Sequence, residues 1–89
     1  MADSDETLLE FPCEYSVKAM GVSAPDFSNL VFDLVAGHVA DLSRAAVKEK
    51  PSKKGKYVSV TVTFTAQSKA QLDAIYYALT GHEKVVMAL

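Results

Sequence analysis

The stretch YVSVTVTFTA, residues Tyr57–Ala66, alternates apolar side chains with polar, mostly hydroxyl-bearing ones along most of its length. This period of two predicts a β-strand with one face in the core and one face open. Threonine and tyrosine form strands readily even where they are half exposed. The predicted core face holds Val58, Val60, Val62 and Phe64, and the predicted open face holds Tyr57, Ser59, Thr61, Thr63 and Thr65.

The residues before this strand predict a hairpin. Pro51–Lys56 is a polar segment with proline and glycine, which is typical of a hairpin loop. We call this segment, which carries three lysines, the lysine hairpin. Arg44–Lys50 is expected to be the preceding strand, with Ala45 and Val47 on one face.

Two further segments predict helices. In Ser23–Val39, Ser23 and Asp26 have the spacing of a capping box, and the apolar stripe comprises Phe27, Leu30, Val31, Leu34, Val35 and His38. In Ser68–Thr80, Ser68 and Gln71 form a second capping box, and Gly81 stands at a C-cap position. The stripe of this second helix comprises Leu72, Ile75, Tyr76 and Leu79.

The two remaining strands complete a βαββαβ order. Alternating Tyr15, Val17 and Ala19 predict a strand over Glu14–Met20, which Gly21 is expected to end, and Val85–Leu89 predicts a short last strand. This order is the ferredoxin-like arrangement, an α+β fold. Right-handed crossovers then place both helices on one face of a four-stranded antiparallel sheet of order 4-1-3-2. Val60 and Leu34 are expected to be buried where the strand and helix faces meet.

A chain of 89 residues suffices for one domain. We expect a flexible tail over residues 1–7, a turn of helix over Thr7–Leu9, and a single domain over residues 8–89. Leu8, Leu9 and Phe11 are expected to tuck under that domain. The sequence contains no apolar run of 18 residues, so it predicts no membrane-spanning helix and indicates a cytoplasmic protein.

Composition argues against several functional classes. Cys13 is the single cysteine, so it forms no internal disulfide and no zinc site. The formal net charge of −2 and the pI of about 5.5 disfavour a dedicated nucleic-acid binder. Neither a catalytic residue, nor a metal site, nor a cofactor is expected.

Four places in the chain resemble the YbeD-like family of small bacterial proteins of uncharacterised function. They are Leu9–Pro12; Tyr15, Lys18, Met20 and Gly21; Pro51, Ser52, Lys54, Gly55, Tyr57, Ser59 and Val60; and Val86, Met87 and Leu89. The resemblance implies an ACT-like ferredoxin fold and a bacterial cytoplasmic setting. It implies no reaction, although ACT-like domains typically bind small effectors or regulate enzymes.

Isolated reactive side chains offer weak candidates for a site. His38 is interpreted as a helix-terminal histidine near the negative end of the dipole, with acid–base chemistry as the alternative. His82, which follows Gly81, is expected to be solvated in a turn. Cys13 is expected to be a half-buried structural cysteine, because neither positive charge nor a helix N-terminus lies near it in the sequence.

The lysine hairpin and the open sheet face beside it are the best candidate site. The predicted binding residues are Lys18, Ser52, Lys54, Gly55, Tyr57 and Ser59, with Lys18, Lys54 and Tyr57 expected to converge. This predicts a non-catalytic regulatory or interaction module that binds a protein partner or a small anionic effector, and a homodimer is compatible with it. The alternatives are a solvated turn without function, an RNA-binding protein and an enzyme.

Overall fold

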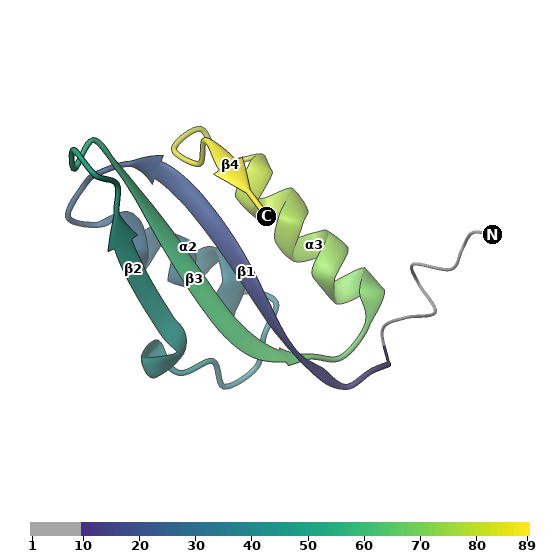
Figure 1. Cartoon of the computed structure of the whole chain (residues 1–89). Coiled ribbons are helices and arrows are strands. Elements are labelled where there is room, and N and C mark those ends of the chain that lie inside the picture. The colour runs from purple at the N-terminus through teal and green to yellow at the C-terminus, as the bar shows by residue number, and fades with distance from the viewer. Residues whose placement is uncertain (1–9) are drawn as a thin grey trace.

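The computed structural model describes residues 10–89 (Figure 1). The predicted tail, the turn Thr7–Leu9 and the side chains of Leu8 and Leu9 lie outside these residues, whereas Phe11 packs against the core as expected. The strands are β1 (Cys13–Val22), β2 (Val47–Pro51), β3 (Tyr57–Ala66) and β4 (Met87–Ala88). The helices are α2 (Phe27–Ala36) and α3 (Lys69–Thr80), and a 3-10 turn covers Arg44–Ala46.

The predicted topology is confirmed. The four strands form one sheet in the order β2-β3-β1-β4, and every neighbouring pair is antiparallel. β1 and β3 pair over ten residues each, from Cys13 opposite Ala66 to Val22 opposite Tyr57. Figure 1 shows this long pair at the centre, with α2 behind it, so the viewer looks onto the open face of the sheet.

The core lies between the sheet and the two helices. It contains the buried side chains of β1, β3, α2 and α3, including Val17, Val31, Val35, Val60, Val62, Ile75 and Leu79. Val60 is fully buried, as predicted. Leu34 is only partly buried, because Val31 and Val35 occupy the centre of the α2 contact and leave Leu34 on its flank.

The first strand does not end at Gly21. Gly21 is buried within β1, which continues to Val22. A Cβ atom at Gly21 would lie 2.5 Å from both the Lys84 carbonyl oxygen and an edge carbon of the Phe27 ring. The residue is therefore glycine because two neighbouring elements approach its backbone closely, and not because a strand ends there.

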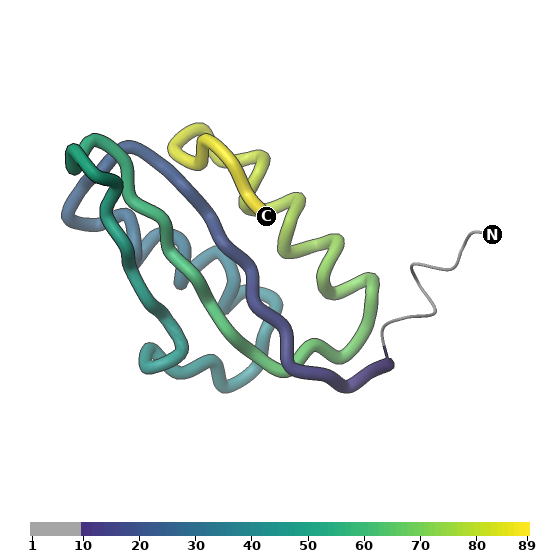
Figure 2. The backbone as a smooth tube through the Cα atoms, viewed as in Figure 1, coloured from purple at the N-terminus to yellow at the C-terminus, as the bar shows by residue number. Residues whose placement is uncertain are grey.

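The predicted start of the first helix is wrong. α2 begins at Phe27 after Asp26, and no side chain caps it. The Ser23 amide instead donates to the Lys56 carbonyl oxygen at 2.9 Å, which joins the end of β1 to the lysine hairpin, and Figure 2 shows these segments side by side. The helix ends at Ala36, so His38 is exposed and does not extend the apolar stripe.

The second helix begins where the sequence predicts. The Ser68 hydroxyl accepts from the Gln71 amide at 3.1 Å, as in a capping box. The side-chain oxygen Oε1 of Gln71 accepts from the backbone amide of Gln67, one residue before the expected partner, at 2.7 Å. Gly81 follows the helix with a φ of −81°, so its C-cap position does not use the left-handed region.

Both edge strands are shorter than predicted. The Ser43 hydroxyl accepts from the Ala45 amide at 3.1 Å and starts a 3-10 turn, so β2 begins only at Val47 and Ala45 is exposed. Pro51 ends β2 on the edge of the sheet, where its missing N–H breaks no ladder. β4 covers Met87–Ala88, although backbone bonds between Leu89 and Lys18 extend its pairing with β1.

Candidate functional site: the lysine hairpin and the open sheet face

Ser52 and Gly55 build the turn of the lysine hairpin. The Ser52 amide donates to the Tyr57 carbonyl oxygen at 2.8 Å, and the Ser52 hydroxyl accepts from the Tyr57 amide at 3.1 Å. The Gly55 amide donates to the Ser52 carbonyl oxygen at 2.9 Å. Gly55 has a φ of +73°, a conformation that glycine adopts without a steric penalty. Ser52 and Gly55 therefore have a structural role in the hairpin turn. The exposed lysines of the hairpin are the side chains that can contact a partner.

Tyr57 and Ser59 continue this surface onto β3. The Tyr57 side chain is 37% exposed, and the Lys56 ammonium lies 5.6 Å from the centre of its ring, within range of a cation–π contact. The Ser59 hydroxyl donates to the Lys50 carbonyl oxygen at 3.3 Å. Tyr57 is thus available for contact, whereas the hydroxyl of Ser59 is already used within the sheet.

Lys18 lies on the same face but not beside Tyr57. Tyr57 is opposite Val22, whereas Lys18 is opposite Thr61, four residues further along β1. This offset corresponds to about 13 Å along the strand. The expected convergence of Lys18, Lys54 and Tyr57 on one point is therefore wrong, and the role of these residues in binding stays a prediction.

Lys48 and Lys50 also belong to this surface, although they are not among the binding residues predicted from the sequence. The register places Lys50 opposite Ser59 and Lys48 opposite Thr61, and both lysines are exposed. Val47 packs against the core, and successive side chains of a strand point to opposite faces. This alternation is the sequence signal that indicates Lys48 and Lys50 on the open face.

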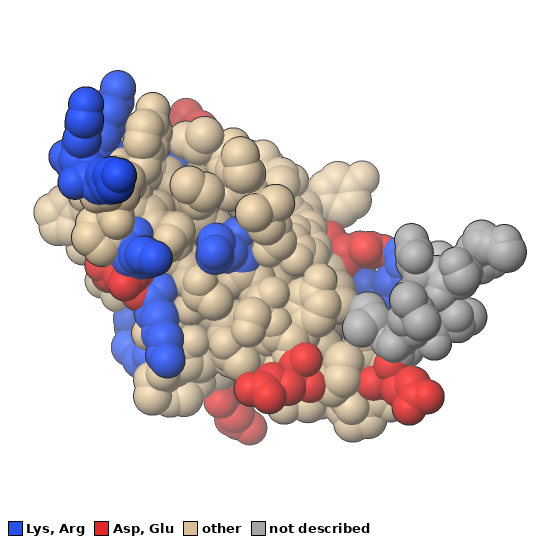
Figure 3. Space-filling view, viewed as in Figure 1, with Lys and Arg blue, Asp and Glu red and all other residues tan. Residues whose placement is uncertain are grey.

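Charge is segregated over this face. Figure 3 shows that lysine and arginine gather over the hairpin end and along β2, whereas most acidic side chains lie toward the opposite end of the sheet. A shallow depression of about 180 Å³ lies at the hairpin end, lined by Met20, Lys50, Pro51, Ser52, Tyr57, Val58 and Ser59. The face thus combines positive charge with a small apolar surface.

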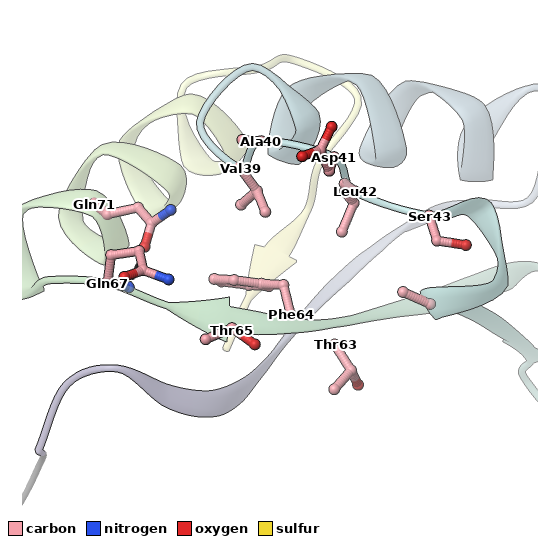
Figure 4. A pocket seen from close by; sticks show the side chains of 11 residues that line it. Val39, Ala40, Asp41, Leu42, Ser43, Thr63, Phe64, Thr65, Gln67 and Gln71 are labelled. Carbon is pink, nitrogen blue, oxygen red and sulfur yellow. Dashed lines mark hydrogen bonds between the residues drawn. The ribbon is translucent and has the colours of Figure 1, made fainter.

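A second cavity, of about 300 Å³, lies between the α2–β2 connection and the end of β3 (Figure 4). The Phe64 ring lies beneath the connection, with Val39 and Leu42 opposite it. Among the lining residues Asp41 is the single ionisable one, and the Gln71 amide group is already bonded to the His38 carbonyl oxygen at 2.7 Å. The cavity therefore brings together no acid–base pair.

The isolated histidines and the cysteine remain apart. His38 is exposed after α2, and His82 accepts from the Lys84 amide at 3.1 Å through Nδ1, within a turn. Cys13 is half-buried against the core, as predicted. Across residues 10–89, no three His, Cys, Asp or Glu side chains are grouped as a metal site would require.

Tyr15 and Tyr76 form a polar contact at the edge of the core. Their hydroxyl oxygens lie 3.3 Å apart. Burial raises the pKa of Tyr76 well above its ordinary value, and the hydrogen bond to Tyr15 and the charge of its phenolate raise it further. Tyr76 therefore keeps its proton in the folded state at pH values where an exposed tyrosine loses it.

The fold and this surface define a small α+β protein of the ferredoxin-like class with a basic, open sheet face. Residues 6–89 match the family described as "Protein of unknown function (DUF493)". Proteins named "UPF0250 protein" from Paraburkholderia phytofirmans and Chromobacterium violaceum are each 40% identical over 89 residues, covering 100% of both chains. The chain belongs to this DUF493 (UPF0250) family of small bacterial proteins, and the YbeD-like resemblance is confirmed.

Solved structures show the same fold in a distant protein. The solution structure of protein HP0495 from Helicobacter pylori covers 100% of this chain and 93% of its own, with a TM-score of 0.71 and 17% sequence identity. None of the family or protein names above indicates a catalytic family. In the described part of the chain, neither helix has the length and apolar character needed to cross a membrane.

Proposed function

We propose that this protein is a non-catalytic interaction module of the cytoplasm that binds an acidic protein partner through the lysine hairpin and the open sheet face. The observation that carries the proposal is the gathering of Lys18, Lys48, Lys50 and the hairpin lysines on one face of a chain whose net charge is −2. Charges gathered in this way steer an oppositely charged partner and set its register.

The shape of the surface favours a protein over a small effector. Small-molecule sites are usually enclosed pockets of roughly 300–1,000 Å³. The depression beside the hairpin is shallow and measures about 180 Å³. A partner that covers the whole face would use the lysines and the apolar surface together.

RNA binding is less well supported. Domains of this topology stack bases on aromatic side chains that lie close together on the sheet. On the open face of β3, Tyr57 is followed by Ser59 and Thr61, neither of which is aromatic. The lysines are therefore better suited to carboxylates of a protein than to the phosphates of RNA.

The test is partner capture from the native cytoplasm with the wild-type chain and with a Lys54→Ala/Tyr57→Ala variant. We expect the double variant to lose the partner while its melting temperature barely changes, because both side chains are exposed. Capture by the wild-type chain should weaken as salt rises, because exposed ion pairs are screened.

A matched control removes the same two residue types elsewhere. Lys84→Ala/Tyr77→Ala takes one exposed lysine from the α3–β4 turn and one tyrosine, 80% exposed, from α3. This control should capture the partner like the wild-type chain. Equal capture by the hairpin variant would show that the lysine hairpin is a solvated turn.

A further inference from the structure

The open face changes in character from one edge of the sheet to the other. The register places Lys50, Ser59, Met20 and Met87 in one row across β2, β3, β1 and β4. In the next row Lys48, Thr61 and Lys18 follow one another, and backbone bonds bring Leu89 beside Lys18. The side chains are thus basic on β2, short and hydroxyl-bearing on β3, and mainly apolar on β4.

Over the two rows of Ser59 and Thr61, the short side chains of β3 stand lower than their neighbours, and we call this stretch the trough. Ser59 and Thr61 stand between lysines on β2 and the Met20 and Lys18 side chains on β1. The Ser59 hydroxyl is bonded to a β2 carbonyl oxygen, and the hydroxyls of Thr63 and Ser16 lie 2.8 Å apart. Because these three hydroxyls already have partners, an apolar group that covers them leaves none of the three unsatisfied.

The flanking strands of the trough are spaced to hold one face of an α-helix, which rests on the sheet with its borders over β2 and β1. β2 and β1 are two strand spacings apart, which is about 9.6 Å. An α-helix with its side chains is about 10–12 Å across and satisfies its own backbone groups. An added strand would instead need an edge of the sheet, and at the β2 edge Pro51 and the exposed lysines disfavour such pairing.

We infer that the acidic partner docks as an amphipathic α-helix that lies along β3 in this trough. Its apolar stripe rests on Met20 and Tyr57, and its flanking carboxylates pair with Lys50 on one side and Lys18 on the other. This inference rests on the proposed function and specifies which element of the partner the face receives. Charge complementarity selects a helix with glutamate or aspartate on both borders of the apolar stripe.

The charge along the trough also sets the direction of the helix. Glu14 is exposed on the open face opposite Thr65, at the end of the β1–β3 pair furthest from the lysine hairpin. The N-terminus of a helix carries partial positive charge and the C-terminus partial negative charge. The C-terminus of the docked helix therefore lies at the lysine hairpin, and its N-terminus lies toward Glu14.

The experiment uses a designed peptide of about 18 residues, or about 27 Å of helix, with leucine on one face and glutamate along both borders. Titrated into the isotope-labelled full chain, it should shift the amide resonances of β1 and β3. A spin label at the C-terminus of the peptide should broaden the amides of Lys53–Lys56. Lys50→Glu should weaken the affinity at least tenfold, whereas the control Lys84→Glu should leave it unchanged.

A scrambled peptide of equal composition, without the apolar stripe, separates the alternatives. Equal binding of this scrambled peptide would overturn the docked helix. Broadening of the amides around Glu14, in place of those of the hairpin, would overturn the direction of the helix. Neither result would contradict the proposed function. If the hairpin variant loses the native partner but the wild-type chain does not bind the designed peptide, the docked helix is overturned and the proposed function is kept. Tighter binding of a mixed-sequence single-stranded RNA would overturn both, and concentration-dependent shifts of the same face would identify a second copy as the occupant.

Discussion

Replacing Gly21 by alanine tests the packing that joins β1, α2 and the α3–β4 turn. The added Cβ atom would meet the Lys84 carbonyl oxygen and the Phe27 ring at 2.5 Å. Normal contact distances between such atoms are about 3.5 Å or more. The backbone carbonyl cannot rotate away, and the Phe27 ring is only 2% exposed, so one of the two elements has to move.

Overpacking of this kind usually costs about 1–3 kcal/mol of unfolding free energy. For a domain of this size each kcal/mol lowers the melting temperature by roughly 4–8 °C. We therefore expect Gly21→Ala to lower the urea midpoint and the melting temperature clearly, measured by circular dichroism. The slope of the urea transition should stay unchanged, because the folded state remains equally compact.

Gly37→Ala is the matched control. A Cβ atom at Gly37 would have its nearest neighbour at 3.7 Å, and the residue already has a helical φ of −64°. Alanine there should be neutral or stabilise the fold by about 0.4–1 kcal/mol, because it restricts the unfolded chain. Similar effects of the two substitutions would refute the account of Gly21 as a close-approach position.

Three other predictions concern the core, the thiol and the paired tyrosines. Val60→Ala should lower the unfolding free energy by about 2–4 kcal/mol, and Leu34→Ala by less because Leu34 is only partly buried; equal losses in urea denaturation would contradict this packing. Cys13→Ala should leave partner capture intact, and unusually fast labelling of Cys13 by a thiol reagent at neutral pH would count against its structural role. Because the pKa of Tyr76 is raised in the folded state, this tyrosine loses its proton at a lower pH in the unfolded chain than in the folded one. The free energy of unfolding should therefore fall as the pH rises above about 10. Tyr76→Phe should reduce this fall, whereas the control Tyr77→Phe should not.

The order of elements and the inward faces of the strands could be predicted because they follow from local periodicity. The alternation of Val58 to Phe64 and the capping serine at Ser68 each depend on a few neighbouring residues. The element ends could not be predicted in the same way. Gly21 looked like a terminator because its contacts with Phe27 and Lys84 come from elsewhere in the chain.

The clustering of the hairpin lysines could be predicted from the sequence, whereas the other residues of the same face could not, and a binding role for any of them stays a prediction. The hairpin lysines are adjacent in the sequence, so their clustering was visible at once. The contribution of Lys48, Lys50 and Met87 to the same face depends on strand register, which only pairing with β3 and β1 establishes. For the same reason the sequence placed Lys18 too close to Tyr57.

The most direct test of the proposed contact surface is a map of the amide resonances that shift when the captured partner is titrated into the full chain. The account predicts that the largest shifts lie in Lys48–Tyr57 and around Lys18 and Met20 on β1, and that they shrink as salt is added. Shifts confined to the outer surface of α3 around Tyr77, with the lysine hairpin unaffected, would contradict it.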